Sequence, residues 1–202
     1  MHYTPESLRH TRNPGLLVYL HGDGESALSA LTYRLERDFR AVAEEKGMVV
    51  IAVQAYQGFR LVNEYGKYAY DDCKNTVDAI LLAHKIWGVN PWETYLVGYS
   101  AGGPGAVLIA RSELRPVIRA VNLWCAPFNI YALIPNLYTA QAPVRLVSNA
   151  GDPNYTLSFP YWQHYLSAYG HSVEAVLETH LSGHQFDAQS VQNAVDWMMQ
   201  LP

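Results

Sequence analysis

A serine flanked by glycines stands between an apolar run and a helical segment near the middle of the chain. The motif is Gly98-Tyr99-Ser100-Ala101-Gly102, followed by Gly103. Alone, a G-x-S-x-G pattern is weak evidence for a catalytic serine, because a glycine-rich turn can carry a serine that has no catalytic role. Here a strand-like run (TYLVG) enters the motif and a helix-like run (GAVLIAR) leaves it, as in a nucleophile elbow. Ser100 is therefore the candidate nucleophile, in a tight turn that needs the flanking glycines.

A serine hydroxyl needs a neighbouring base, and one of the eight histidines is well placed to supply it. His184 lies in the segment Ser182-Gly183-His184-Gln185-Phe186, between the last apolar run and the last helical segment. From a loop at that position an imidazole can reach across a sheet edge to Ser100. The histidines that we expect to be structural or exposed are His2, His10, His84, His164, His171 and His180.

The third member of such a site is a carboxylate that orients the histidine, and Asp152 is the candidate. It follows the apolar run 144–149 and lies between Ser100 and His184 in the chain. A carboxylate there can accept the Nδ1 proton of the histidine and stabilise the imidazolium. The alternative role is that of an Asp-Pro turn former, since Pro153 comes next. Asp187 is a weaker rival, better explained as a charge near the start of the last helix.

Negative charge that develops on a substrate oxygen requires donors already aimed at it. The Ala101 amide, next to the serine at a helix N-terminus, is one expected donor. The second should come from the glycine-rich turn after the first apolar run, with the Asp23 amide preferred and the Gly24 amide as the alternate. His21 in this turn could be mistaken for a catalytic residue, but we expect it to hold the loop by side-chain hydrogen bonds.

Apolar runs alternate along the chain with segments of helical period. The predicted strands cover 15–20, 48–53, 93–98, 117–124, 143–149 and 172–179, and the predicted helices cover 27–46, 71–87, 101–111, 158–169 and 187–200. Strands that are apolar on both faces and joined by helical crossovers predict a mainly parallel sheet with helices on both faces. We expect one doubly wound α/β domain over residues 1–202, with about six strands and a polar N-terminal segment 1–14.

The composition and charge of the chain argue against some classes of binding partner. The chain has 202 residues, of which 50% are hydrophobic and 16% charged, and its formal net charge is −4. These values suit a folded domain and argue against a nucleic-acid or anionic-membrane partner, which would need a basic patch. No apolar stretch is long enough for a membrane span, and residues 1–14 lack the apolar region of a signal peptide. We therefore expect a cytoplasmic protein, with secretion left open if a signal was removed.

Only two cysteines are present, Cys73 and Cys125, and no CxxC motif. Two reduced, partly buried thiols are the expectation for a cytoplasmic protein. The alternative is one disulfide, because we expect both residues to follow strands at the same sheet edge. No metal-ligand spacing or phosphate-binding loop occurs, so neither a metal nor a cofactor is expected.

These motifs resemble the α/β-hydrolase superfamily over nearly the whole chain. The matching segments are LHGDG at 20–24, GYSAGG at 98–103, GDP at 151–153 and SGHQF at 182–186, and the order Ser, Asp, His also matches. Within the superfamily, the chain looks most like small esterases related to polyhydroxybutyrate depolymerases and feruloyl esterases. It departs from the pattern by lacking an evident N-terminal antiparallel strand pair and a helical cap insertion.

The resemblance implies cleavage of a small-molecule carboxylic ester through an acyl-enzyme. Alternatives are thioester, amide or peptide cleavage, acyl transfer, and a non-catalytic binding module on the same fold. Tyrosines gather in three segments, 54–70, 126–141 and 153–161, which could roof an aromatic pocket or only pack loops onto the core. The expected pocket residues are Gly22, Gly24, Tyr56, Tyr99, Phe128 and Tyr155, and neither Arg60 nor Lys67 is clearly placed to bind an anion. The oligomeric state is left open.

Overall fold

One mixed sheet organises the computed structural model, which describes all residues except 10–12, 26–27, 56–58, 60–67, 112–117 and 134–141. Its strands, in chain order, are β1 (His2–Tyr3), β2 (Leu16–Leu20), β3 (Val49–Ala52), β4 (Thr94–Tyr99), β5 (Ile118–Trp124), β6 (Val144–Ala150) and β7 (Val173–Ser182). Their order across the sheet is β1-β3-β2-β4-β5-β6-β7. All pairs are parallel except that of β1 with β3.

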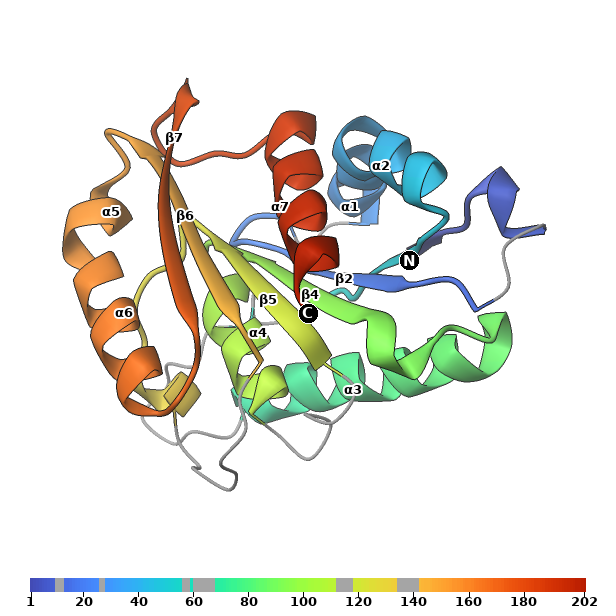
Figure 1. Ribbon diagram of the computed structural model, residues 1–202, viewed down its shortest axis with the longest axis horizontal. Helices are drawn as coiled ribbons and strands as arrows, with labels where there is room; N and C mark the ends of the chain where they lie inside the picture. The colour runs from blue at the N-terminus through green and yellow to red at the C-terminus, as the bar shows by residue number, and fades with distance from the viewer. Residues whose placement is uncertain (10–12, 26–27, 56–58, 60–67, 112–117, 134–141) are drawn as a thin grey trace.

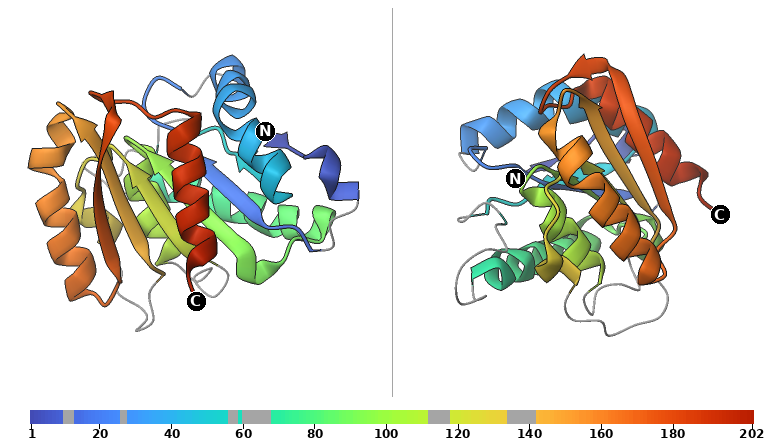
Figure 2. Two further views of the ribbon diagram at one scale, coloured as in Figure 1. Left: turned by 45° about the horizontal axis from the view of Figure 1, so that its top comes forward. Right: turned by 90° about the vertical axis from the view of Figure 1, so that its left-hand side faces the viewer.

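Helices cover both faces of this sheet (Figure 1). They are α1 (Leu28–Arg34), α2 (Arg40–Lys46), α3 (Tyr68–Trp87), α4 (Gly102–Ala110), α5 (Pro153–Leu157), α6 (Phe159–Ala168) and α7 (Ala188–Gln200). The helices α1, α2 and α7 lie on one face, and α3 and α4 lie on the other (Figures 1 and 2). This doubly wound α/β arrangement confirms the predicted fold class.

The central strands are apolar on both sides because each side meets a helical layer. Every residue of β2 is buried. Leu16, Val18 and Leu20 belong to the core beneath α3, α4 and α6, whereas Leu17 and Tyr19 belong to the core beneath α1, α2 and α7. Burial on both faces explains the near-continuous apolar runs that predicted these strands.

The sheet has one strand more than expected. His2 and Tyr3 form β1 and pair antiparallel with Ile51 and Val50, and the Met1 ammonium donates to the Ala52 carbonyl at 2.8 Å. A strand of two residues is too short to show an apolar period, so the polar segment 1–14 concealed it. No antiparallel strand pair was evident in this segment from the sequence, and among the described residues the segment supplies one short antiparallel strand.

Two helical details also differ from the prediction. The single helix expected over 27–46 contains a π-helical segment, Leu35–Phe39, between α1 and α2. Apolar residues at positions 31, 35, 39 and 42 reach the core in either helix type, so their spacing does not distinguish them. The short helix α5 was not predicted, and it begins directly after Asp152.

The two cysteines are free and buried. Cys73 lies within α3 and packs in the core beneath α3, α4 and α6, so the expectation that it follows a strand was wrong. Cys125 follows β5 and packs in the core on the opposite face of the sheet. A disulfide between the two is excluded by this placement, since the sheet separates them.

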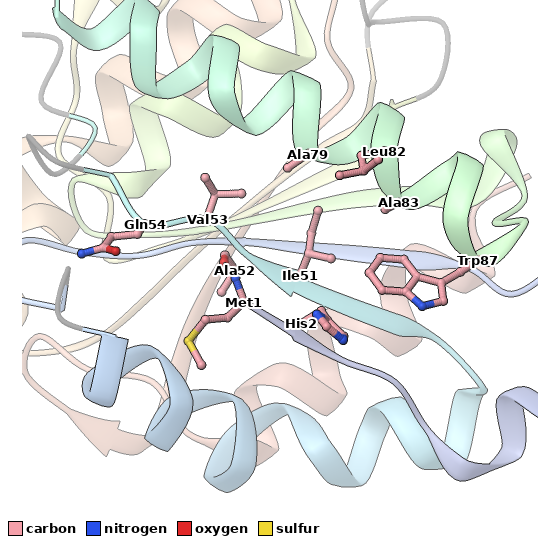
Figure 3. Close-up of a pocket in the computed structure, with 10 residues that line it drawn as sticks. All are labelled: Met1, His2, Ile51, Ala52, Val53, Gln54, Ala79, Leu82, Ala83 and Trp87. Carbon is pink, nitrogen blue, oxygen red and sulfur yellow. Dashed lines mark hydrogen bonds between the residues drawn. The ribbon is translucent and has the colours of Figure 1, made fainter.

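A pocket of about 230 Å³ lies at the β1 edge of the sheet, against α3 (Figure 3). Its lining residues are Met1, His2, Ile51, Ala52, Val53, Gln54, Ala79, Leu82, Ala83 and Trp87. None of the expected pocket residues is among them. In the described part of the chain, no helix is both long and apolar enough to cross a membrane.

Candidate active site

Ser100 occupies a strained turn between β4 and α4. Its φ is +50°, in the left-handed region that residues with a Cβ rarely adopt. Glycine is required at both ends of this turn. A Cβ at Gly98 would lie 2.7 Å from the Gly102 carbonyl oxygen, and a Cβ at Gly102 would lie 2.1 Å from the Leu20 oxygen of β2. The local structure is therefore the predicted elbow, with the serine raised at the carboxyl end of the sheet.

His184 follows β7 on a short loop and reaches this serine. Its Nε2 lies 2.8 Å from Ser100 Oγ, and its Nδ1 lies 3.3 Å from Asp152 Oδ1. The tautomer consistent with both contacts carries its proton on Nδ1 and accepts the serine proton at Nε2. Tyr99 supports the loop, because its hydroxyl donates to the His184 carbonyl at 2.8 Å. Burial raises the pKa of Tyr99 to about 12, so the phenol keeps the proton that it donates.

Asp152 is buried and held by several donors. It caps α5 by accepting the Asn154 amide at 2.9 Å, and its second oxygen accepts the Ser148 hydroxyl at 2.9 Å. Burial raises the pKa of this carboxyl, but hydrogen bonds from Cys125, Asn154, Ser148 and His184 outweigh burial and bring the pKa below its usual value. The carboxylate is therefore charged at neutral pH. Asp152 therefore both caps a helix and contacts His184, and its role as the orienting acid stays a prediction.

Cys125 lies beside the Asp152 carboxylate, a contact that was not predicted from the sequence. It is 1% exposed, follows β5 and has a φ of +53°. Its Sγ lies 3.6 Å from the Gln185 carbonyl oxygen. Burial and the neighbouring Asp152 raise the pKa of this thiol, so Cys125 does not compete with Ser100 as a nucleophile at neutral pH. The sequence signal was only its position after a strand, which does not reveal a tertiary contact.

The loop after β2 passes over the elbow. A Cβ at Gly22 would lie 3.1 Å from Ser100 Cβ, so this backbone runs directly beside the nucleophile. His21 is fully buried; its Nδ1 lies 2.8 Å from the Gly22 oxygen, and its Nε2 accepts the Ala55 amide at 3.0 Å. His21 therefore holds the loop, as predicted. Asp23 and Gly24 follow on its exposed side, and the assignment of Asp23 and Ala101 amides as oxyanion donors stays a prediction.

The residues expected to line a substrate pocket do not all lie at the site of Ser100 and His184. The Tyr99 ring packs beneath the site, with its centroid 5.3 Å from that of His184. Phe128 packs among the rings of α6, 5.1 Å from Trp162 and 5.4 Å from Tyr165, which favours a packing role. Tyr155 is 40% exposed and packs on Phe159. The side chains that fall outside the described residues are those of Tyr56, Tyr65, Tyr68, Tyr70, Tyr131, Tyr138, Arg60 and Lys67.

Asp187 is separate from this site. It caps α7 by accepting the Ser190 amide at 3.0 Å, and it lies 3.2 Å from His180 Nε2. Its predicted place at the start of the last helix is confirmed. Two histidines expected to be structural also have protein partners, since His84 bonds Thr94 and His171 bonds Ala142.

No protein-family model and no curated protein matches the sequence, but solved structures match the fold. An S-formylglutathione hydrolase from Staphylococcus aureus is 16% identical, with a TM-score of 0.70 over 98% of this chain and 91% of that one. A carboxylesterase from Mesorhizobium loti is 19% identical, with a TM-score of 0.66 over 93% and 89%. The Francisella virulence factor BioJ is 12% identical, with a TM-score of 0.74 over 99% and 80%. This chain has the α/β-hydrolase fold.

The α/β-hydrolase fold accounts for where the site residues come from. Ser100, Asp152 and His184 follow β4, β6 and β7, whose carboxyl ends lie at one edge of the sheet. A large cap between strands is lacking in the described residues. The narrower resemblance to polyhydroxybutyrate depolymerases and feruloyl esterases stays a prediction, because none of these three structures is named for either activity.

Proposed function

We propose that this protein is a serine hydrolase that cleaves a small-molecule carboxylic ester through an acyl-enzyme. The proposal is carried by one observation, the chain of contacts from Ser100 Oγ to His184 Nε2 at 2.8 Å and from His184 Nδ1 to Asp152 at 3.3 Å. A serine within reach of an oriented base is an activated nucleophile. The carboxylesterase and S-formylglutathione hydrolase named above, which share the fold, support the same reaction class.

In the proposed mechanism, Ser100 attacks the ester carbonyl while His184 Nε2 takes its proton. The buried Asp152 carboxylate stabilises the resulting imidazolium and keeps Nε2 directed at the serine. The amides of Ala101 and Asp23 stabilise the oxyanion. His184 then protonates the leaving alcohol, and water, activated by the same imidazole, releases the acid and restores Ser100.

Thioester cleavage is the second candidate function, since one of the named structures is an S-formylglutathione hydrolase. The nucleophile, base and oxyanion donors serve an S-acyl bond equally well, and only the leaving atom differs. The non-catalytic alternative is disfavoured by the geometry. A binding module would have no need to keep a serine at a φ of +50° within hydrogen-bond reach of a histidine.

The experiment that tests the proposal is hydrolysis of p-nitrophenyl acetate, butyrate and octanoate, a feruloyl ester and an acyl thioester, each with the parent protein and Ser100→Ala. We expect turnover of at least one substrate class and a loss of several orders of magnitude in kcat in the variant. Activity near the parent rate in Ser100→Ala would contradict the assignment. The ratio of oxygen-ester to thioester turnover decides between the two candidate functions.

A further inference from the structure

The candidate base and two side chains beside it carry three different metal-binding atoms. The Cys125 sulfur, an Asp152 carboxylate oxygen and a His184 ring nitrogen all lie within 4.8 Å of one another. They follow β5, β6 and β7, so three adjacent strand ends supply them. The substrate chemistry proposed above uses only two of these residues. The thiol donates a hydrogen bond to Asp152 but takes no part in the bond-making steps of that reaction.

The donor set suits a cation of the zinc class. Zinc and cadmium accept sulfur, imidazole nitrogen and carboxylate oxygen together, usually in tetrahedral sites. Ligand atoms around such an ion stand about 3.5 Å apart, as follows from metal–ligand distances of about 2.0 to 2.3 Å. The contact of 3.3 Å between His184 Nδ1 and Asp152 Oδ1 is already of this size. The Cys125 sulfur lies within 4.8 Å of the other two ligand atoms, so a shift of up to about 1.3 Å would bring it to a third corner of the tetrahedron.

Surrounding contacts hold the three ligands in place. The Asn149 amide donates to the carbonyls of Gly183, at 2.9 Å, and Gln185, at 2.5 Å, on either side of the histidine. Ser148 and Asn154 fix the carboxylate. Such supporting hydrogen bonds orient metal ligands and strengthen binding.

Access is from the histidine side. Cys125 and Asp152 are buried, whereas His184 is exposed. An ion would therefore reach the two buried ligands past the histidine ring.

We propose that a thiophilic divalent cation, of the class of Zn²⁺ or Cd²⁺, binds Cys125, Asp152 and His184 and reversibly switches off the nucleophile. The ion takes the Nδ1 lone pair, so the ring proton leaves Nδ1 and the neutral ring carries its proton on Nε2. Nε2 then donates to Ser100 Oγ and no longer accepts its proton. Cys125 binds as a thiolate, and its proton passes to the solvent. The site is inhibitory and supplies no catalytic metal.

The inhibition rests on the proposed function, but the binding does not, so each is measured separately. Purified protein is titrated with Cd²⁺ while the ultraviolet thiolate-to-cadmium charge-transfer band is recorded, and ester hydrolysis is followed in parallel. Cys125→Ser removes the sulfur at nearly constant size. Cys73→Ser is the matched control, because it changes the buried cysteine on the opposite face of the sheet. His184→Gln removes the exposed ligand without repacking the core.

We expect the charge-transfer band to saturate at one Cd²⁺ ion per chain and the esterase activity to fall as the band grows. A chelator should remove the band and restore the activity. Cys73→Ser should behave as the parent does. Cys125→Ser should lose the band and need about ten-fold more Cd²⁺ or beyond for half inhibition, and His184→Gln should bind more weakly. A band that is absent from the parent, kept in Cys125→Ser or lost in Cys73→Ser would overturn the site. A parent that shows the band without esterase activity would retain the site and refute the proposed function.

Discussion

Of the four described residues other than glycine that have left-handed backbone, two lie directly after strands of the site. Ser100 has a φ of +50° and Cys125 a φ of +53°, and the Ser100 amide donates to the Trp124 carbonyl just before Cys125. Each residue with a Cβ in this region costs about 1 kcal/mol or more. The surrounding sheet maintains both conformations. Strain in the described strand ends is thus located at the candidate nucleophile and at the thiol beside its acid.

The charge of Asp152 can be tested apart from its structural role. Asn caps helices about as well as Asp, so Asp152→Asn should keep α5 while it loses the charge that orients and stabilises His184. We expect kcat/KM for the best ester to fall about a thousand-fold to ten-thousand-fold, with little change in thermal stability.

Asp187→Asn is the matched control, since Asp187 also caps a helix but does not bond His184. It should keep both the activity and the fold. Equal losses of activity in the two variants would refute the assignment of Asp152 as the orienting acid.

At the scale of elements, the close approach of α4 to β2 determines the backbone conformation of the turn that carries Ser100. In Gly102→Ala the new methyl would meet the backbone oxygen of Leu20, which cannot move without breaking the sheet. We expect a loss of about 3 kcal/mol or more in the free energy of unfolding, measured by urea denaturation.

Gly88→Ala separates steric conflict from backbone conformation. Gly88 has a φ of +59°, and a Cβ there meets nothing within 4 Å. This variant should lose only about 1 kcal/mol, the cost of a left-handed alanine. Comparable losses in the two variants would mean that contact with β2 does not control the turn.

Most helices and strands could be predicted because each covers enough residues for its apolar pattern to be recognised. The buried strands β2 to β6 appear as apolar runs, and Ser100 and Asp152 were identified because each follows such a run. His184 was identified because it lies between the last predicted strand and the last predicted helix. β1 was missed because two residues show no period, and the pairing comes from β3 rather than from local preference. Cys125 was missed for a related reason, since its contact with Asp152 depends on how β5 and β6 lie side by side.

At the scale of the whole molecule, one buried histidine links stability to pH. His171 is 4% exposed; its Nδ1 donates to the Ala142 carbonyl at 2.8 Å, and Arg111 lies 3.3 Å from its Nε2. Burial lowers the pKa of His171 to about 4, with a further lowering by the Arg111 charge that the Ala142 bond partly offsets. The folded protein therefore keeps this ring neutral in mild acid.

The sign of the pH effect follows from this shift. Below the ordinary value of 6.5 the unfolded chain binds a proton at His171, while the folded chain does so only near pH 4. Stability should therefore fall as the pH decreases from about 6.5 to about 4, and this residue should account for about 2 kcal/mol at pH 5. His171→Gln should show a correspondingly smaller loss between pH 7 and pH 5 in urea denaturation. His164→Gln, at an exposed position of α6, should keep the parent's dependence.

The most direct test of the central claim is covalent labelling with a fluorophosphonate, located by peptide mass spectrometry. We predict one adduct per chain on Ser100, slower labelling in Asp152→Asn, and no adduct in Ser100→Ala, because only a serine beside an oriented base reacts rapidly. Labelling of a different residue, or none in the folded parent protein, would contradict the account of Ser100 as an activated nucleophile.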